Sequence, residues 1–384
     1  MNTSCNDKLK MTNDKLINKK RLVRRFINYV KVPSLSKSEK IFAKFIRHEL
    51  SSLKIRSYQD EIGNIFADIK GDDNKAPRLL LNAHLDTVGP GEKIKPKIRY
   101  GIIISDGKTI LGADNKAGIA VIIEVLKTIK EEKISHGDIQ VVFTVQEEIG
   151  LLGAKAIKKN WLNADVGYVL DGGDVDALYN KAPTQYNMTA EVIGRAAHAG
   201  VHPEKGINAI KVASVAIAKM KLGRIDRETT ANIGIIKGGS ATNIVPDKVE
   251  IKGEARSHNI RKLKAQLKHM RRCLSQVCYK HKAQVKVNMD NVYNSFSLDK
   301  DEKVVKIAQR ALLNIGIKPK IKLTGGGSDA NIFNAMGIKT LIIGVGADRV
   351  HTKNERIAVD ELYAGAKFLL EIIKEAHARK NLKK

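Results

Sequence analysis

Short apolar segments recur along this chain, and polar residues that carry chemistry follow them directly. The segment Leu79–Leu81 is continuously apolar, which is typical of a strand covered on both faces. Similar segments lie at 64–71, 139–145, 166–170 and 340–346, and helical patterns lie at 21–53, 115–133, 301–314 and the C-terminus. Because strands and helices alternate, the sequence predicts an α/β layer structure.

The pattern changes character after Asp171. Strands are expected at 184–194, 231–236, 245–256 and 284–289, and helices at 206–222 and 260–281, the second capped by Asn259. The order strand–helix–strand–strand–helix–strand predicts a self-contained ferredoxin-like module. The α/β pattern then resumes. The expected organisation is a polar extension at 1–20, a discontinuous α/β domain at 21–180 and 291–384, and an inserted α+β domain at 181–290.

Composition excludes several classes of protein. The 384 residues are 43% hydrophobic, which argues against disorder, and no apolar run is long enough to span a membrane. The N-terminus is too polar for a secretory signal. Cys5, Cys273 and Cys278 are odd in number and wrongly spaced for a disulfide framework or a zinc knuckle, so a reduced, cytoplasmic setting is expected.

The formal net charge of +27 raises nucleic acid or another polyanion as a partner. The excess is heaviest at 181–290, with 21 Lys and Arg against 8 Asp and Glu. The apolar stripe expected on the helix at 260–281 consists of Leu263, Leu267, Met270, Leu274 and Val277. Its basic residues therefore face mainly the other way. With aromatics at only 5%, we favour a solvated surface and expect no nucleic-acid binding.

His84 and Asp86 stand in the motif HLDT, where an apolar strand ends. Residues two apart on a strand point to the same side, so the pair suits a metal ligand and the carboxylate that orients it. Alone, it could equally be a satisfied His–Asp pair. Asp114, in LGADNKAG, lies at a loop-to-helix junction and could be an N-cap carboxylate.

Three further positions follow predicted strands in the same way. Glu147 and Glu148 follow the strand at 139–145, Asp171 ends the strand at 166–170, and His351 follows the strand at 340–346 after a short loop. Ligands of open α/β sheets bind at the carboxyl ends of strands. Two His and several carboxylates converging there suit a divalent transition metal, zinc by default, and are numerous enough for two ions.

The motifs HLDTV, GADNKAG, QEEIG, LDGG, GRAAHAG, ATNIVP, GGGSDAN and HTKNE occur in this order. In this the chain resembles the dinuclear zinc exopeptidases of the peptidase T, glutamate carboxypeptidase and aminoacylase group, most closely the peptidase T-like branch. The resemblance covers residues 20–378. It implies a mixed-sheet catalytic domain with an inserted ferredoxin-like lid that also mediates dimerisation.

The resemblance also implies roles for the strand-end residues. His84 and Asp171 would bind one metal ion, Glu148 and His351 the other, and Asp114 would bridge the two. The peptide bond after Asp114 is expected to be cis. In the same way, Asp86 would orient the His84 ring, and Glu147 would be the general base that takes a proton from the attacking water.

In the inserted domain the resemblance implies substrate-binding residues. His198 would stabilise the developing oxyanion, often from the neighbouring subunit, while Asn243 and Arg256 would hold the free carboxylate of the substrate. Gly326 belongs to the glycine loop at 325–327, which we interpret as the floor of the substrate pocket. As a phosphate loop it is poor, because no Lys-Ser/Thr follows and no strand is expected before it.

The expected function is that of a cytoplasmic metallo-exopeptidase. Its substrates would be short peptides, tripeptides or dipeptides, which it would cleave at the amino end. Its cofactors would be two divalent ions, most simply zinc, with manganese or cobalt also possible, and it would form a homodimer. An N-acyl amino acid amidohydrolase or deacetylase with the same metals is the alternative enzyme. A basic polyanion-binding protein is the alternative of another class, and it leaves the metal-binding pattern unexplained.

Overall fold

The computed structural model describes residues 16–378, which form two compact units. The first comprises residues 16–180, 297–323 and 328–378, and the second comprises 181–296 and 324–327. The expected start of the resumed α/β domain at 291 falls inside strand β13 (Gln284–Tyr293). Helix α2 (Lys19–Lys31) begins within the expected extension, most of which lies outside the described residues.

The first unit contains a mixed sheet, nine-stranded among the described residues. Its strands are β1 (Ser57–Gln59), β2 (Ile65–Ile69), β3 (Leu79–His84), β6 (Ile139–Thr144), β7 (Val166–Gly172), β8 (Ala177–Ala182), β14 (Phe296–Ser297), β15 (Lys320–Leu323) and β16 (Lys339–Gly344). The order is β1-β2-β6-β3-β7-β16-β8-β14, and β15 pairs with β8. The four central strands β6, β3, β7 and β16 are parallel, so their carboxyl ends share one edge.

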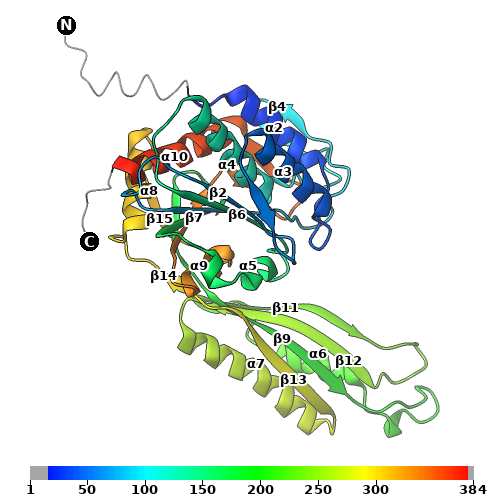
Figure 1. Ribbon diagram of the computed structural model, residues 1–384. Coiled ribbons are helices and arrows are strands. Elements are labelled where there is room, and N and C mark those ends of the chain that lie inside the picture. Colours follow the sequence, from blue (N-terminus) through cyan, green and yellow to red (C-terminus); the bar gives the residue numbers. More distant parts are fainter. Residues whose placement is uncertain (1–15, 379–384) are drawn as a thin grey trace. The chain divides into compact units, whose positions relative to one another are not determined.

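Helices cover both faces of this sheet. They are α2, α3 (Lys40–Ser52), α4 (Ala113–Glu131), α5 (Leu152–Ala156), α8 (Lys303–Asn314), α9 (Asp329–Ala335) and α10 (Val359–Ala378), with a 3₁₀ turn at Lys159–Trp161. Figure 1 shows α4 and α10 on one face and α5 and α9 on the other. Because helices cover both faces of the sheet, every residue of the central strands β3 and β6 is buried.

A small antiparallel sheet completes the first unit. It consists of β17 (Ala347–Asp348), β18 (Arg356–Ala358), β5 (Ile102–Ile104) and β4 (Lys97–Arg99), in that order. These strands are too short to give a clear period in the sequence, and none of them was expected.

The single helix expected over 21–53 is wrong, since the segment forms α2 and α3. The break follows Lys31, where Val32 is extended with ψ of 117°. Pro33 accounts for this, because the ring of a proline disfavours helical backbone at the residue before it. Helix α2 is then fastened to α4, where the buried Glu124 forms ion pairs with Arg21 and Arg25.

The second unit is an antiparallel sheet with two helices. Its elements are β9 (Thr184–Ile193), a 3₁₀ turn (Pro203–Lys205), α6 (Ala209–Ala218), β10 (Gly223–Arg224), β11 (Thr229–Gly238), β12 (Lys248–Ser257), α7 (Ile260–Lys280) and β13. The sheet order is β10-β11-β12-β9-β13. The four long strands therefore have the ferredoxin-like order, and the expected α/β fold class with an inserted α+β module is confirmed.

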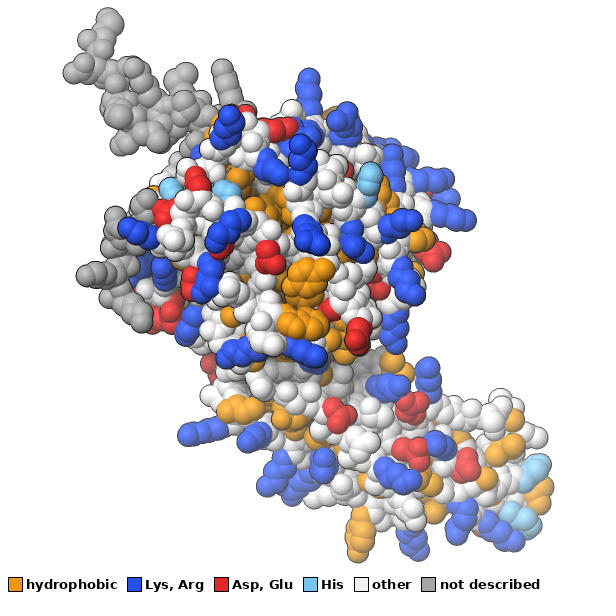
Figure 2. All heavy atoms as spheres, in the orientation of Figure 1, with side chains coloured by type: hydrophobic (Ala, Val, Ile, Leu, Met, Phe, Trp, Pro, Cys, Tyr) orange, Lys and Arg blue, Asp and Glu red, His pale blue; other side chains and the backbone are white. Residues whose placement is uncertain are grey.

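Helix α7 shows the predicted amphipathic pattern. All five residues of the expected apolar stripe are buried against the sheet, and Asn259 caps the helix by accepting from the N–H of Arg261 and of Lys262. Basic residues on the other face, Arg261, Lys264, Lys268, Arg271 and Arg272, are exposed. Figure 2 shows Lys and Arg side chains spread over the visible surface of both units rather than gathered in one groove.

Within residues 16–378, no helix is both long and apolar enough to cross a membrane. Cys273 and Cys278 are buried thiols without a disulfide, and Cys5 lies outside the described residues.

Candidate active site

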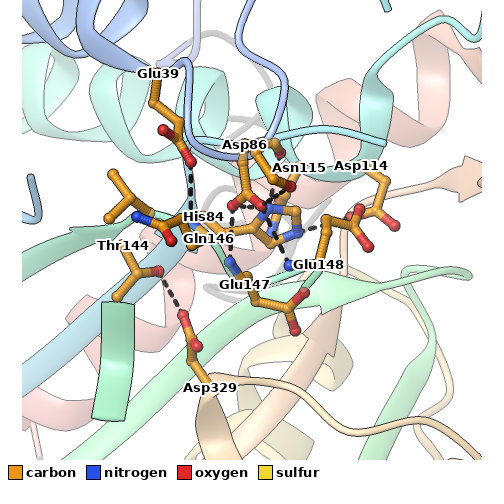
Figure 3. Close-up of polar contacts among 12 residues, drawn as sticks. Glu39, His84, Asp86, Asp114, Asn115, Thr144, Gln146, Glu147, Glu148 and Asp329 are labelled. Atoms are coloured by element: carbon orange, nitrogen blue, oxygen red, sulfur yellow. Dashed lines mark hydrogen bonds and ion pairs between the residues drawn. The ribbon is translucent and has the colours of Figure 1, made fainter. Parts of the chain in front are cut away.

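The predicted strand-end residues meet at the carboxyl edge of the parallel strands. Pairing of β3 with β6 places His84 beside Thr144, three residues before Glu147. Strand β7 brings Asp171 to the same edge, next to β3 on its other side. Figure 3 shows His84, Asp114 and Glu148 close together there, drawn from three different segments of the chain.

His84 faces two carboxylates with one ring nitrogen. Its Nε2 lies 3.0 Å from Asp114 Oδ1 and 3.5 Å from Asp171 Oδ1. Its Nδ1 lies 2.9 Å from the carbonyl oxygen of Asp86 and 3.4 Å from the Oδ1 atom of that residue. Because a carbonyl oxygen only accepts, Nδ1 carries the hydrogen. Although burial opposes this, hydrogen bonds to Asp114 and Asp171 raise the pKa of His84 in the metal-free protein. Once Nε2 is deprotonated, the ring presents the Nε2 lone pair to the site, as a metal ligand does.

His351 occupies the other side of Asp114. Its Nε2 lies 3.2 Å from Asp114 Oδ2 and 3.0 Å from Glu148 Oε1. The two oxygens of Asp114 thus face two different histidines. All five residues expected to bind metal are brought together, and Asp114 lies between the two halves.

The backbone around Asp114 is unusual. The Asp114–Asn115 peptide bond is cis, so this expectation is confirmed. The side-chain amide of Asn115 donates to Asp171 Oδ1 at 3.2 Å. The alternative that Asp114 is an N-cap carboxylate is wrong, because its two side-chain oxygens lie against His84 and His351 instead of the first N–H groups of the helix.

Asp86 joins the histidine to the loop that carries the paired glutamates. Its Oδ1 accepts from the N–H of Glu147 at 2.9 Å, and its Oδ2 accepts from the N–H of Glu148 at 3.2 Å and from the hydroxyl of Ser36 at 2.7 Å. A single buried carboxylate therefore fixes both the His84 ring and the turn after β6.

Several carboxylates lie close together in the site and are largely buried, and this shifts their pKa values. Burial and the charge of Asp114 raise the pKa of Asp171 to about 7, although His84 opposes this. Burial raises the pKa of Glu147 well above its usual value. Despite burial, hydrogen bonds from His351 and His84 hold the pKa of Asp114 below its usual range. Hydrogen bonds to Asp114 and Glu148 raise the pKa of His351 to about 10.

This donor set fits a pair of divalent transition ions. Ligand atoms about 2.0–2.2 Å from a tetrahedral zinc ion lie about 3.3–3.6 Å from one another. The His–carboxylate separations of 3.0–3.5 Å are close to that range. One ligand atom each from His84, Asp114 and Glu148 lies within 4.8 Å of the others. Two imidazoles with three carboxylates accept zinc, manganese or cobalt.

Sequence reasoning missed two buried carboxylates beside the site. Glu39 Oε1 accepts from the N–H of Lys37 at 3.0 Å and of Gln146 at 3.1 Å. Asp329 accepts a hydrogen bond from the hydroxyl of Thr144, and burial raises the pKa of Asp329 to about 6 (Figure 3). Asp329 stands in the motif GGGSDAN, which predicted that this segment is functional but gave no role to Asp329. No motif or strand-end position in the sequence singles out Glu39.

A third missed carboxylate is Glu355, the last residue of HTKNE. It is buried, and its carboxylate accepts hydrogen bonds from the backbone N–H groups of Leu111, Gly112 and Asp114. Burial raises the pKa of Glu355, while the three N–H groups oppose that shift.

In the second unit, His198 and Asn243 lie together on exposed loops. The N–H of Ala199 donates to the carbonyl oxygen of Asn243 at 2.9 Å. His198 Nδ1 accepts from the N–H groups of Gly200 and Val201 at 3.2 and 3.1 Å. The neutral ring therefore carries its hydrogen on Nε2, which is the donor that an oxyanion needs.

Arg256 and Gly326 lie together elsewhere in the second unit. Glu254 holds the Arg256 guanidinium through Nε and Nη2, both at 2.9 Å. A Cβ on Gly326 would lie 4.0 Å from Arg256 Nη1, and one on Gly327 would lie 2.1 Å from the Tyr293 ring. The loop therefore packs closely on Tyr293 but leaves space beside Arg256. The expectation that no strand precedes it is wrong, because β15 ends at Leu323.

The structure separates two residues that the sequence reasoning grouped. Asn243 precedes β12 and Arg256 is near its carboxyl end. At about 3.3 Å per residue, the eight steps from Lys248 to Arg256 span about 26 Å. Asn243 and Arg256 of one chain therefore do not bind the same carboxylate, because strand β12 lies between them.

Residues 80–375 match the model of Peptidase family M20/M25/M40, so the chain belongs to this family. A tripeptidase from Staphylococcus aureus subsp. aureus Mu50 is 41% identical, with a TM-score of 0.88 over 94% of this chain and 100% of that one. The aminopeptidase PepT from Bacillus cereus ATCC 10987 has the same identity and coverage, with a TM-score of 0.83. The protein YqjE of Bacillus subtilis is 41% identical over 94% of this chain and 100% of its own length.

Within the family the chain falls in the peptidase T-like branch, as its motifs predict. It is a hydrolase that acts on peptide bonds.

Proposed function

We propose that this protein is a metal-dependent exopeptidase that removes residues from the amino end of tripeptides and dipeptides. The observation that carries the proposal is the meeting of His84, His351 and three carboxylates at the carboxyl edge of the parallel sheet, with Glu147 beside them. The tripeptidase and the aminopeptidase, each 41% identical, support the substrate class.

His84 and Asp171 would hold one ion, Glu148 and His351 the other, and Asp114 both. Bound ions, zinc by default, would supply the Lewis acidity that acidifies a water molecule and polarises the substrate carbonyl.

Glu147 is the proposed general base. Its backbone N–H donates to Asp86, which fixes the position of the Glu147 backbone next to the proposed ligand Glu148. Burial raises the pKa of Glu147, which makes its carboxylate a stronger acceptor for a proton from water, and the acid so formed could then donate that proton to the leaving amine.

Arg256 and the glycine loop would bind the carboxylate end of the peptide. Its fork is held by Glu254 and faces Gly326, which leaves room for a backbone or carboxylate to approach. We assign His198 and Asn243 to the site of a second copy of the chain, because they lie about 26 Å along β12 from Arg256.

A homodimer through the second unit follows from this assignment. Apolar side chains are exposed on β11 and on the loops beside His198: Val201, Ile235, Ile236 and Ile244. Such side chains are more typical of an interface than of a surface facing water. The unpaired thiols of Cys273 and Cys278 are compatible with the cytoplasmic setting that we propose.

The test is release of amino acids from matched free and N-acylated dipeptides and tripeptides, with zinc, manganese or chelator. We expect metal-dependent cleavage of free peptides, abolished by chelator. Cleavage of the N-acylated substrates alone would support the amidohydrolase instead. No turnover with any metal would overturn both the exopeptidase proposal and the amidohydrolase alternative.

A further inference from the structure

Glu355 makes contacts that its position in the chain does not suggest. Its side chain is only 1% exposed, and both carboxylate oxygens accept backbone N–H groups from a segment more than 240 residues away. Oε2 accepts from Leu111 and Gly112, both at 2.8 Å, and Oε1 accepts from Asp114 at 3.0 Å.

These donors belong to the loop that leads into α4. Leu111 and Gly112 precede the helix, and Asp114 has non-helical backbone, with φ of −81° and ψ of 104°. Leu111 and Gly112 are buried, and a buried N–H group without a partner costs free energy. Glu355 therefore supplies, from a distant segment, the acceptor oxygens that this loop needs.

The same short segment also carries His351. The N–H of Glu355 donates to the carbonyl oxygen of Thr352 at 3.1 Å, which closes a turn between the histidine and the glutamate. One turn therefore places His351 Nε2 next to Asp114 Oδ2 and also holds the backbone N–H of Asp114. Both Glu355 oxygens accept hydrogen bonds from N–H groups. We therefore do not assign Glu355 as a metal ligand.

We propose that Glu355 is a positioning residue of the metal centre: it fixes Asp114 between the two histidines and ties the Asp114 loop to the His351 loop. This inference rests on the proposed metal site. It explains how a carboxylate that must face two ions is held at the end of a loop.

The test is direct metal binding rather than turnover. Glu355→Gln keeps the size of the side chain but places an amide N–H₂ against one or more backbone donors. Groups that hold ligands in this way typically change metal affinity by about 10- to 100-fold. We expect a loss of that size, measured by competition with a chromogenic chelator, and a smaller loss in Glu355→Asp, which keeps two acceptor oxygens.

Asp138→Asn is the matched control. Asp138 Oδ1 accepts from the N–H of Gly71 at 3.0 Å, at the start of β6 and so at the opposite edge of the sheet from the site. Its substitution also removes a carboxylate that holds a loop, and we expect metal affinity to stay within a factor of two of wild type.

The outcomes separate this inference from the proposed function. If the wild-type protein binds no divalent ion, the proposed metal site fails. If wild type binds and Glu355→Gln binds equally tightly, only the role of Glu355 is overturned. Thermal unfolding of the metal-free forms shows whether Glu355→Gln folds, and Glu355→Asp carries the test if it does not.

Discussion

The backbone N–H of Glu147 donates to Oδ1 of Asp86 at 2.9 Å. The carboxylate that lies against the His84 ring therefore also sets the position of the proposed base. His84 ends β3, and Glu147 lies three residues after the end of β6. This hydrogen bond therefore ties the ends of the two strands together, with the proposed ligand on one and the proposed base beyond the other.

Glu147→Gln should reduce kcat by about 10²- to 10⁴-fold, which is the usual contribution of a positioned general base. The amide cannot accept the proton, but it keeps the shape of the side chain. Metal content and the thermal midpoint should stay close to those of wild type. Glu61→Gln, at an exposed site, is the control, and a fully active Glu147→Gln enzyme would contradict the proposed role.

Asp86→Asn should weaken metal binding by about 10- to 100-fold and also lower kcat, because one carboxylate supports both His84 and the turn after β6. Chelator competition measures the first effect and steady-state kinetics at saturating metal the second. If kcat recovers fully at saturating metal, Asp86 acts on the ligand and not on the base.

Metal binding should strengthen as the pH rises from 6 to 9. The ligands bind ions in their deprotonated forms, whereas the pKa of His351 is raised to about 10 and that of Asp171 to about 7 in the metal-free protein. Binding at pH 7 therefore releases at least the His351 proton. For each proton released, the metal affinity rises by about tenfold per pH unit. Calorimetry in buffers of different ionisation enthalpy counts the protons, and a buffer-independent heat would contradict this assignment.

Gly327→Ala should destabilise the protein by about 1–3 kcal/mol, because the added Cβ would lie 2.1 Å from the Tyr293 ring. Gly325→Ala is the matched control two residues away, where a Cβ meets nothing within 4 Å. Denaturant unfolding compares the two. Equal stability of both variants would mean that the loop does not pack on Tyr293 as described.

His198→Ala and Glu147→Gln should each be nearly inactive, and their mixed dimer should recover activity. In a mixed dimer, one site combines an intact Glu147 with His198 of the other chain. Random association of equal amounts gives about a quarter of the wild-type activity. No recovery in dimers that light scattering shows to be mixed would place His198 in the site of its own chain.

Much of the candidate site could be predicted from the sequence. His84, Asp171 and the glutamate pair each follow an apolar strand, and the parallel pairing of β3, β6 and β7 brings such positions to one edge. Asp114 and His351 needed their motifs, since Asp114 follows no strand and His351 follows β16 only after a loop. The small sheet of β4, β5, β17 and β18 left no readable pattern, because its strands have two or three residues each.

The sequence by itself determined the two kinds of layer, the ferredoxin-like insertion and which polar residues meet at the edge of the sheet, since local periodicity, strand-end position and short motifs are properties of neighbouring residues. Only the tertiary structure decided that Glu355 holds the loop at Leu111–Asp114 from more than 240 residues away, and that β12 keeps Asn243 and Arg256 apart. Both are relations between distant segments. They depend on strand lengths and loop paths, which packing fixes and local sequence does not encode.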